Sequence, residues 1–253
     1  RIEENFSLDP LSGYRIRQDL IEARLSGHDL ADQFQIQRAK GDLPQGNIGR
    51  LFYGVLQKQT ETFASKLLEI IADEHAESLP VDLILSGIRL TGTLEGLYPQ
   101  GRIQVRFARR RAKDYLSAWI YHLVLCRATV NGRNPQTLLV GADGIARIRP
   151  VDRPGEILKE ILETFKEGLC RPLHFFPDLS LHFLKLTVES GKPMDAAIER
   201  VRKKWVGSDF QRGVAEDPYY RLCFGGSDPI DEQFEGLADN ILAPLLRHVE
   251  ELP

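Results

Sequence analysis

The hydrophobic pattern of this chain changes its period at Pro80, and this change limits the folds that are open to it. Before Pro80, apolar residues recur at helical spacing. After Pro80, apolar and polar residues alternate in "VDLILSGIRLTGTLEGLY" and again in "RIQVRF", as in strands with one buried face. Helical spacing returns in "YLSAWIYHLVL" and dominates the last third of the chain. This order favours an α/β fold in which one small mixed sheet is flanked by helices.

Turn and capping residues predict where the elements begin and end. Ser12 is the expected N-cap of the first helix, Pro154 the expected first residue of another, and Asp143-Gly144 the expected turn of a hairpin. Helices are predicted over residues 13–25, 30–40, 48–75, 112–126, 154–169, 179–190, 193–206 and 230–251. Strands are predicted over residues 81–98, 102–107, 136–141 and 145–151. We expect a helical segment over 1–76 packed on an α/β core with C-terminal helices over 77–253, together one compact domain.

Composition is typical of a soluble globular protein. Of the 253 residues, 42% are hydrophobic and 27% are charged, and the net charge is −3. No apolar run reaches the roughly 18 residues that span a bilayer, and no basic–apolar leader opens the sequence, so we expect no membrane contact. Cys126, Cys170 and Cys223 are far apart and are expected to be buried free thiols in a reducing compartment. We therefore expect a cytoplasmic protein, of which this chain, beginning at Arg1, is a piece.

The stretch "GTLEGLYPQGRIQVR" predicts a hairpin with polar side chains gathered on one face. If Tyr98-Pro99-Gln100-Gly101 is the turn, Glu95 pairs with Gln104 and Thr93 pairs with Arg106. Because side chains alternate along a strand, Glu95, Gln104 and Arg106 then share one face of the sheet.

This layout is similar to the core of PD-(D/E)xK nucleases, in which two acids hold Mg²⁺ and a lysine activates water. The helix "YLSAWIYHLVL" also occupies the place of the helix that follows the lysine strand in that family. Mg²⁺ prefers anionic oxygen ligands, and Gln104 offers one neutral carbonyl. Arg106 cannot act as a base near neutral pH and would repel a cation. We therefore expect no metal site and no hydrolysis here, with Glu95, Gln104 and Arg106 as vestigial positions. A simpler interpretation is that Glu95 pairs with Arg106 across the sheet.

The stretch from Gly96 to Lys113 contains no acidic residue and six cations, which predicts a sequence-independent contact with DNA phosphates. A solvated face or an interface with an acidic partner are the other interpretations. The predicted DNA-binding residues are Arg102, Arg106, Arg109, Arg110, Arg111 and Lys113.

Two further stretches have a functional and a structural interpretation. "ERVRKKW" at 199–205 is a basic patch that we interpret as a solvated helix face. Tyr219, Tyr220 and Phe224 are able to stack on bases, but the flanking Pro218 and glycines favour anchors into the core or a partner subunit.

Beyond single sites, the chain resembles the C-terminal region of the RecC family, the gamma subunits of exodeoxyribonuclease V. The resemblance rests on "ENFSLDPLSGYRIRQDLIEA", "GDLPQGNIGRLFYGVL", "LTGTLEGLYPQG", "AKDYLSAWIYHLVLC" and "DPYYRLCFGG…LADNILAPLL", which occur in order along nearly the whole chain. It implies a nuclease-like fold without catalytic residues, RecB and RecD subunits as partners, and forked or double-stranded DNA ends as the substrate of the assembly. It implies a role in double-strand-break repair by recombination. It implies no cofactor for this region, because the ATPase motors and the active nuclease of the family lie in the partner subunits.

Two alternatives stay open at this point. One is an active Mg²⁺-dependent nuclease whose missing residues come from elsewhere, for example Glu69, Asp73 or Glu74 on the long helix and Lys113 after the strand. The other is a protein–protein scaffold without DNA contact.

Overall fold

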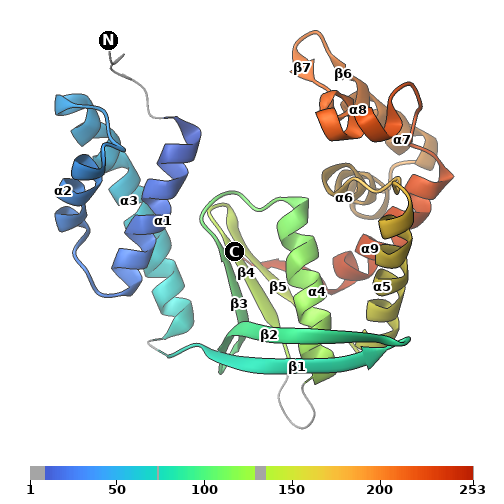
Figure 1. Ribbon diagram of the computed structural model, residues 1–253, viewed down its shortest axis with the longest axis horizontal. Coiled ribbons are helices and arrows are strands. Elements are labelled where there is room, and N and C mark those ends of the chain that lie inside the picture. Colours follow the sequence, from blue (N-terminus) through green and yellow to red (C-terminus); the bar gives the residue numbers. More distant parts are fainter. Residues whose placement is uncertain (1–8, 73, 129–134, 253) are drawn as a thin grey trace. The chain divides into compact units, whose positions relative to one another are not determined.

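The computed structural model describes residues 9–72, 74–128 and 135–252 (Figure 1). Contacts within the chain define two compact units. Unit 1 comprises Arg1–Ala76, Val105–Arg109 and Val140–Gly144, and unit 2 comprises Glu77–Gln104, Arg110–Leu139 and Ile145–Pro253. No helix among the described residues has the length and apolar character needed to cross a membrane.

Three helices account for most of unit 1: α1 (Pro10–Leu25), α2 (Leu30–Lys40) and α3 (Gly46–Ile71). The prediction that Ser12 caps the first helix is wrong. The carboxylate of Asp9 accepts hydrogen bonds from the backbone N–H groups of Leu11 and Ser12 at 2.9 and 3.1 Å, so the helix begins at Pro10. The third helix ends at Ile71 rather than at His75, because Ala72 takes a left-handed conformation with a φ of 53°.

Unit 1 has its own small hydrophobic core between these helices, made of Ile16, Leu20, Leu30, Leu43, Tyr53 and Leu56. The hydroxyl of Tyr53 donates to the carbonyl of Leu30 and so ties α3 to the start of α2. Phe63 of α3 meets Phe107 edge to face, with ring centroids 5.7 Å apart. This contact joins α3 to the segment Val105–Arg109, which also belongs to unit 1.

Six strands form one mixed sheet in the order β1-β2-β3-β4-β5-β8, which confirms the predicted sheet. Their bounds are β1 Glu77–Leu85, β2 Ile88–Tyr98, β3 Gly101–Arg106, β4 Thr137–Gly141, β5 Gly144–Ile148 and β8 Val249–Leu252. The β1–β2 and β5–β8 pairs are antiparallel. Between β3 and β4, the N–H of Arg102 bonds the carbonyl of Gln136 and the N–H of Ala142 bonds that of Ala108, so these strands run parallel. The connection between them contains α4 (Ala112–Ala128).

The rest of unit 2 is helical, with one two-stranded hairpin. Its elements are α5 (Pro154–Cys170), α6 (Pro177–Leu184) with the π-helix η1 (Lys185–Glu189), α7 (Met194–Val206), β6 (Gly207–Ser208), β7 (Gln211–Arg212), the 3-10 helix η2 (Val214–Glu216), α8 (Pro218–Phe224) and α9 (Glu232–His248). Two predictions are wrong here. The residues after His248 form a strand, not the end of a helix, because Val249 to Leu252 pair with β5. The expected loop "DPYYRLCFGGSDP" contains helix α8.

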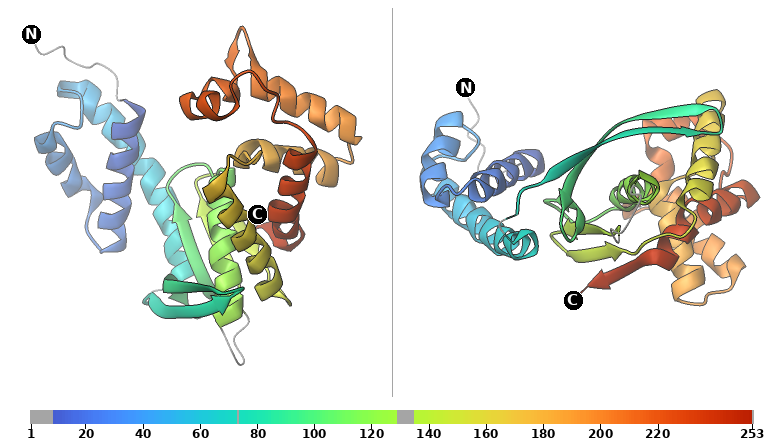
Figure 2. Two further views of the ribbon diagram at one scale, coloured as in Figure 1. Left: turned by 45° about the vertical axis from the view of Figure 1, so that its right-hand side comes forward. Right: turned by 90° about the horizontal axis from the view of Figure 1, so that it is seen from below.

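The core of unit 2 lies between the sheet and helices α4, α5, α6, α7 and α9. Figure 2 shows α4 nearly end-on, with the β1–β2 ribbon curving around it. Trp119 of α4 is fully buried, as are Phe176, Phe183 and Phe234. The expectation of buried cysteines is wrong for Cys170 and Cys223, which are exposed, while Cys126 is half-buried.

Candidate nucleic-acid interface

The hairpin that carries Glu95 has the predicted turn but a shorter ladder than predicted. Tyr98 pairs with Gly101 and Leu97 with Arg102. Among the described residues the β2–β3 ladder contains these two pairs, so the predicted pairs Glu95–Gln104 and Thr93–Arg106 are not part of it. Figure 1 shows β2 and β3 diverging after their shared turn.

A β-bulge in β2 explains this divergence. Glu77 of β1 pairs with Leu97 and Leu79 pairs with Leu94, so Glu95 and Gly96 together face Ser78. Gly96 has a φ of 71°, and a Cβ at this position would lie 2.7 Å from the carbonyl oxygen of Ile103. The bulge buries both Leu94 and Leu97 and leaves Glu95 exposed on the other face.

Gln104 is engaged by a buried arginine. The Nη1 of Arg102 donates to the Oε1 of Gln104 at 2.8 Å, and the guanidinium lies 4.6 Å from the ring centroid of Tyr121. Arg102 is only 8% exposed, and burial lowers its pKa. Burial therefore removes Arg102 from the exposed cations that were predicted to contact DNA. The hydrogen bond from Arg102 also engages the side-chain oxygen of Gln104, which is the atom that Gln104 would offer to a metal.

Arg106 and Arg110 are likewise held by contacts within the chain. The Nε of Arg106 donates to the carbonyl of Arg109 at 3.0 Å and closes the turn after β3. The Nη1 of Arg110 donates to Glu251 at 2.8 Å, and its side chain is 5% exposed. Glu251 also accepts from the hydroxyl of Tyr115 at 2.6 Å, while the Arg110 guanidinium lies 5.5 Å from that ring. Arg110 thus belongs to a cluster that joins β8 to α4 rather than to an open surface.

The N-terminus of α4 is covered by carboxylates. Asp114 accepts from the backbone N–H of Arg111 at 2.7 Å, and Asp178 accepts from that of Ala112 at 3.2 Å. Phosphate would therefore compete with two anions for this helix end. The predicted cations that are exposed are Arg109, Arg111 and Lys113, and within the described residues none of their side chains forms an ion pair.

The described part of the chain contains no group of three or more His, Cys, Asp and Glu side chains able to hold a metal ion. Glu69 and Glu74, two of the alternative metal ligands, are exposed, and the third, Asp73, lies outside the described residues.

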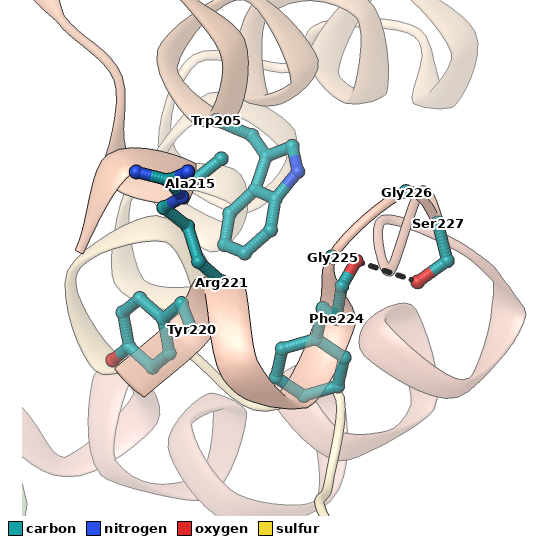
Figure 3. Close-up of a pocket in the computed structure, with 8 residues that line it drawn as sticks. All are labelled: Trp205, Ala215, Tyr220, Arg221, Phe224, Gly225, Gly226 and Ser227. Carbon is teal, nitrogen blue, oxygen red and sulfur yellow. Dashed lines mark hydrogen bonds between the residues drawn. The ribbon is translucent and has the colours of Figure 1, made fainter. Parts of the chain in front are cut away.

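A pocket that the sequence did not predict lies between α7 and α8. It has a volume of about 350 Å³ and is lined by Trp205, Ala215, Tyr220, Arg221, Phe224, Gly225, Gly226 and Ser227 (Figure 3). Tyr220 and Phe224 pack on Phe176 with centroid distances of 5.1 and 5.4 Å, which supports their interpretation as anchors, whereas Tyr219 is exposed. The basic patch of 199–205 is partly paired, since Arg202 bonds Asp228 and Lys203 bonds Glu199.

Comparison with known proteins gives one consistent result. The sequence profile of the RecC C-terminal domain matches residues 2–186. The RecBCD enzyme subunit RecC of Escherichia coli is 27% identical over 96% of this chain and 22% of its own length. The RecC subunits of Mycobacterium tuberculosis and Buchnera aphidicola are 24% and 20% identical over 88% and 98% of the chain, and over 20% and 24% of their own lengths. The chain thus spans less than a quarter of these curated relatives.

Proposed function

Because the chain belongs to the RecC C-terminal domain family, we propose that it is a non-catalytic domain of a RecBCD-type ATP-dependent exonuclease and helicase that acts in recombinational repair of double-strand breaks. In this proposal it binds the RecB and RecD subunits in the cytoplasm and contacts forked or double-stranded DNA ends through their phosphate backbone. Its α/β core is a PD-(D/E)xK nuclease-like fold that has lost its chemistry.

The contact between Arg102 and Gln104 carries the non-catalytic part of this proposal. A metal-dependent nuclease needs anionic oxygens that converge on one ion. Here the position of the second acid is a neutral amide whose oxygen accepts from a buried guanidinium at 2.8 Å. A cation placed beside Gln104 would meet this fixed positive charge, and Glu95 would be the one anion that the hairpin could offer.

This part is tested with the whole RecC subunit, free of RecB and RecD, on a labelled forked duplex with Mg²⁺ or Mn²⁺. We expect intact DNA and no change on Glu95→Ala. Metal-dependent cleavage that disappears in Glu95→Ala would instead establish an active nuclease with relocated residues.

The exposed cations Arg109, Arg111 and Lys113 support the DNA-contact part. These three residues are close together in sequence after β3. The other arginines of this stretch are paired or buried within the chain, so they supply no exposed charge. For every phosphate of duplex DNA that a variant no longer neutralises, the slope of log Kd against log salt falls by about 0.9.

The matching experiment replaces these three residues by glutamate in the assembled RecBCD enzyme. We expect Kd for a forked duplex to rise by about tenfold or more, with a smaller salt dependence, whatever the DNA sequence. The control replaces three other exposed cations by glutamate. These are Lys58, Lys66 and Lys166, which form no ion pair within the described residues. An affinity equal to that of the wild type would leave the domain as a scaffold without DNA contact.

A further inference from the structure

Large apolar side chains are exposed in and around the hairpin β6–β7 and helix α8. Val206, Phe210, Tyr219 and Leu222 are 68%, 99%, 78% and 85% exposed. Phe210 lies in the turn between β6 and β7, and Figure 1 shows this hairpin and α8 at the same end of unit 2. Several large apolar side chains exposed at one end of a folded unit typically mark a binding surface. We call these four residues, together with the pocket between α7 and α8, the α8 surface.

The aromatic residues that line the pocket are held in place by the core of unit 2. Trp205, Tyr220 and Phe224 line it, and their rings pack against Phe176 with centroid distances of 4.7, 5.1 and 5.4 Å. Phe224 and Trp205 are nearly fully buried, so their positions are set by the core of unit 2. Figure 3 shows the ring of Trp205 on one side of the pocket and the rings of Tyr220 and Phe224 on the other, with Gly225, Gly226 and Ser227 beside Phe224. A pocket of about 350 Å³ has room for one large apolar side chain.

One exposed cation lies at the pocket. Arg221 lines the pocket, and its side chain is exposed. Within the described residues Arg221 forms no ion pair, whereas Arg202, Lys203 and Arg212 bond Asp228, Glu199 and Glu216. Of the nearby acids, Asp217 accepts from two backbone N–H groups at the start of α8. A ligand for this surface should therefore carry carboxylates or phosphates as well as an apolar group.

We propose that the α8 surface docks a polypeptide segment of another subunit, which inserts an apolar side chain into the pocket and places carboxylates near Arg221. The inference rests on the proposed function, because it names the surface through which the domain holds a RecB or RecD subunit. Two of the four exposed residues, Val206 and Leu222, are aliphatic and offer no ring on which a base could stack, which favours a polypeptide over single-stranded DNA.

The test uses the whole RecC subunit with purified RecB and purified RecD. Replacement of Phe210 and Leu222 by serine removes two exposed apolar side chains and leaves the buried lining intact. We expect Kd for one of the two subunits to rise by about tenfold or more. Arg221→Glu should weaken the same complex and reduce its salt dependence, and Arg221→Lys should keep most of the affinity.

The matched control is Phe165→Ser with Leu169→Ser on α5, because these side chains are of the same types and are 61% and 72% exposed. The control should bind like the wild type, and an equal loss in both pairs would overturn the assignment to this surface. Unchanged affinity of the Phe210 and Leu222 variant for both subunits would also overturn it. If that variant instead lost affinity for a fluorescent single-stranded oligonucleotide, the surface would bind DNA. A wild-type subunit that bound neither RecB nor RecD would contradict the proposed function itself.

Discussion

Arg102 and His122 are polar side chains that fold into the interior of unit 2 without a carboxylate partner among the described residues. His122 is fully buried on α4. Its Nε2 lies 2.9 Å from the carbonyl of Arg149, which only accepts, so Nε2 carries the proton. Its Nδ1 then accepts from the hydroxyl of Thr137 at 3.1 Å. The neutral ring therefore joins α4 to β4 and to the residue after β5.

The neutral form of His122 predicts a loss of stability in mild acid. Burial is the main reason that the pKa of His122 is lowered to about 4; the nearby His248 and Arg102 act in the same direction, and the hydrogen bond to Arg149 acts against them. Between the unfolded pKa of roughly 6.5 and this value, the unfolded chain binds a proton that the folded chain does not. The free energy of unfolding should fall as pH drops through this window, by up to about 3 kcal/mol, and level off below it.

Urea unfolding at several pH values between neutral and mildly acidic checks this. His122→Gln should flatten the dependence on pH, although it lowers stability at neutral pH. His28→Gln is the control, because His28 is exposed. A pH dependence that survives unchanged in His122→Gln would show that another group is responsible.

Among the secondary-structure elements, β2 has the largest influence on where the side chains of the candidate site lie. Its first part pairs with β1 through Leu94, and its last residues pair with β3. The bulge at Glu95 and Gly96 marks the change between these two parts. Because a bulge adds one residue to one strand, it alters both the direction of the strand and the face on which later side chains lie. Strict alternation along β2 thus predicted the exposed face of Glu95 but not the place where β2 leaves β3.

Because of the bulge, adding a methyl group should lower the stability of the protein at one glycine of β2 and have little effect on it at another. Gly96→Ala should destabilise the protein by about 2 kcal/mol or more, because its φ of 71° and the close carbonyl of Ile103 both oppose a Cβ. Gly92→Ala, in the same strand, meets no atom within 4 Å and should change stability by less than about 0.5 kcal/mol. Thermal unfolding of the two variants gives the comparison, and equal effects would contradict a strained bulge.

At the scale of the whole chain, the end of the sequence completes the sheet. β8 pairs with β5, and Glu250 bonds Arg147 across this pair at 2.8 Å. The next residue, Glu251, bonds Arg110 and Tyr115, which are 141 and 136 residues away along the chain. One carboxylate thus holds the last strand, the segment after β3 and the first turn of α4 together.

This arrangement predicts that Glu251 and Tyr115 are energetically coupled. Glu251→Gln and Tyr115→Phe should each lower the free energy of unfolding by about 1 to 2 kcal/mol. The double variant should lose less than the sum, with a coupling of about 0.5 kcal/mol or more. Chemical denaturation of the four proteins completes the cycle. Strict additivity would mean that the hydrogen bond between Tyr115 and Glu251 contributes nothing to stability.

The sequence by itself determined most elements and the family resemblance. The change of period at Pro80, the turn at Pro99-Gln100 and the start of α5 at Pro154 are local signals, because the spacing of apolar residues and the limited conformations of proline act between neighbours. The same local signals predicted a hairpin whose second acid is replaced by Gln104, and six cations between Gly96 and Lys113. They did not separate exposed cations from buried ones.

Only the tertiary structure decided which of those cations are exposed. Arg102 is buried by Tyr121 and Gln104, and Arg110 by Tyr115 and Glu251, and of these partners Glu251 is far away in sequence. The last strand is a further case: Val249 to Leu252 are a strand because β5 offers an edge, not because of any signal in those four residues. The pocket between α7 and α8 likewise forms only because Phe176 and α8 pack near Trp205 of α7. Burial and pairing are properties of residues that folding brings together, so no pattern along the chain contains them.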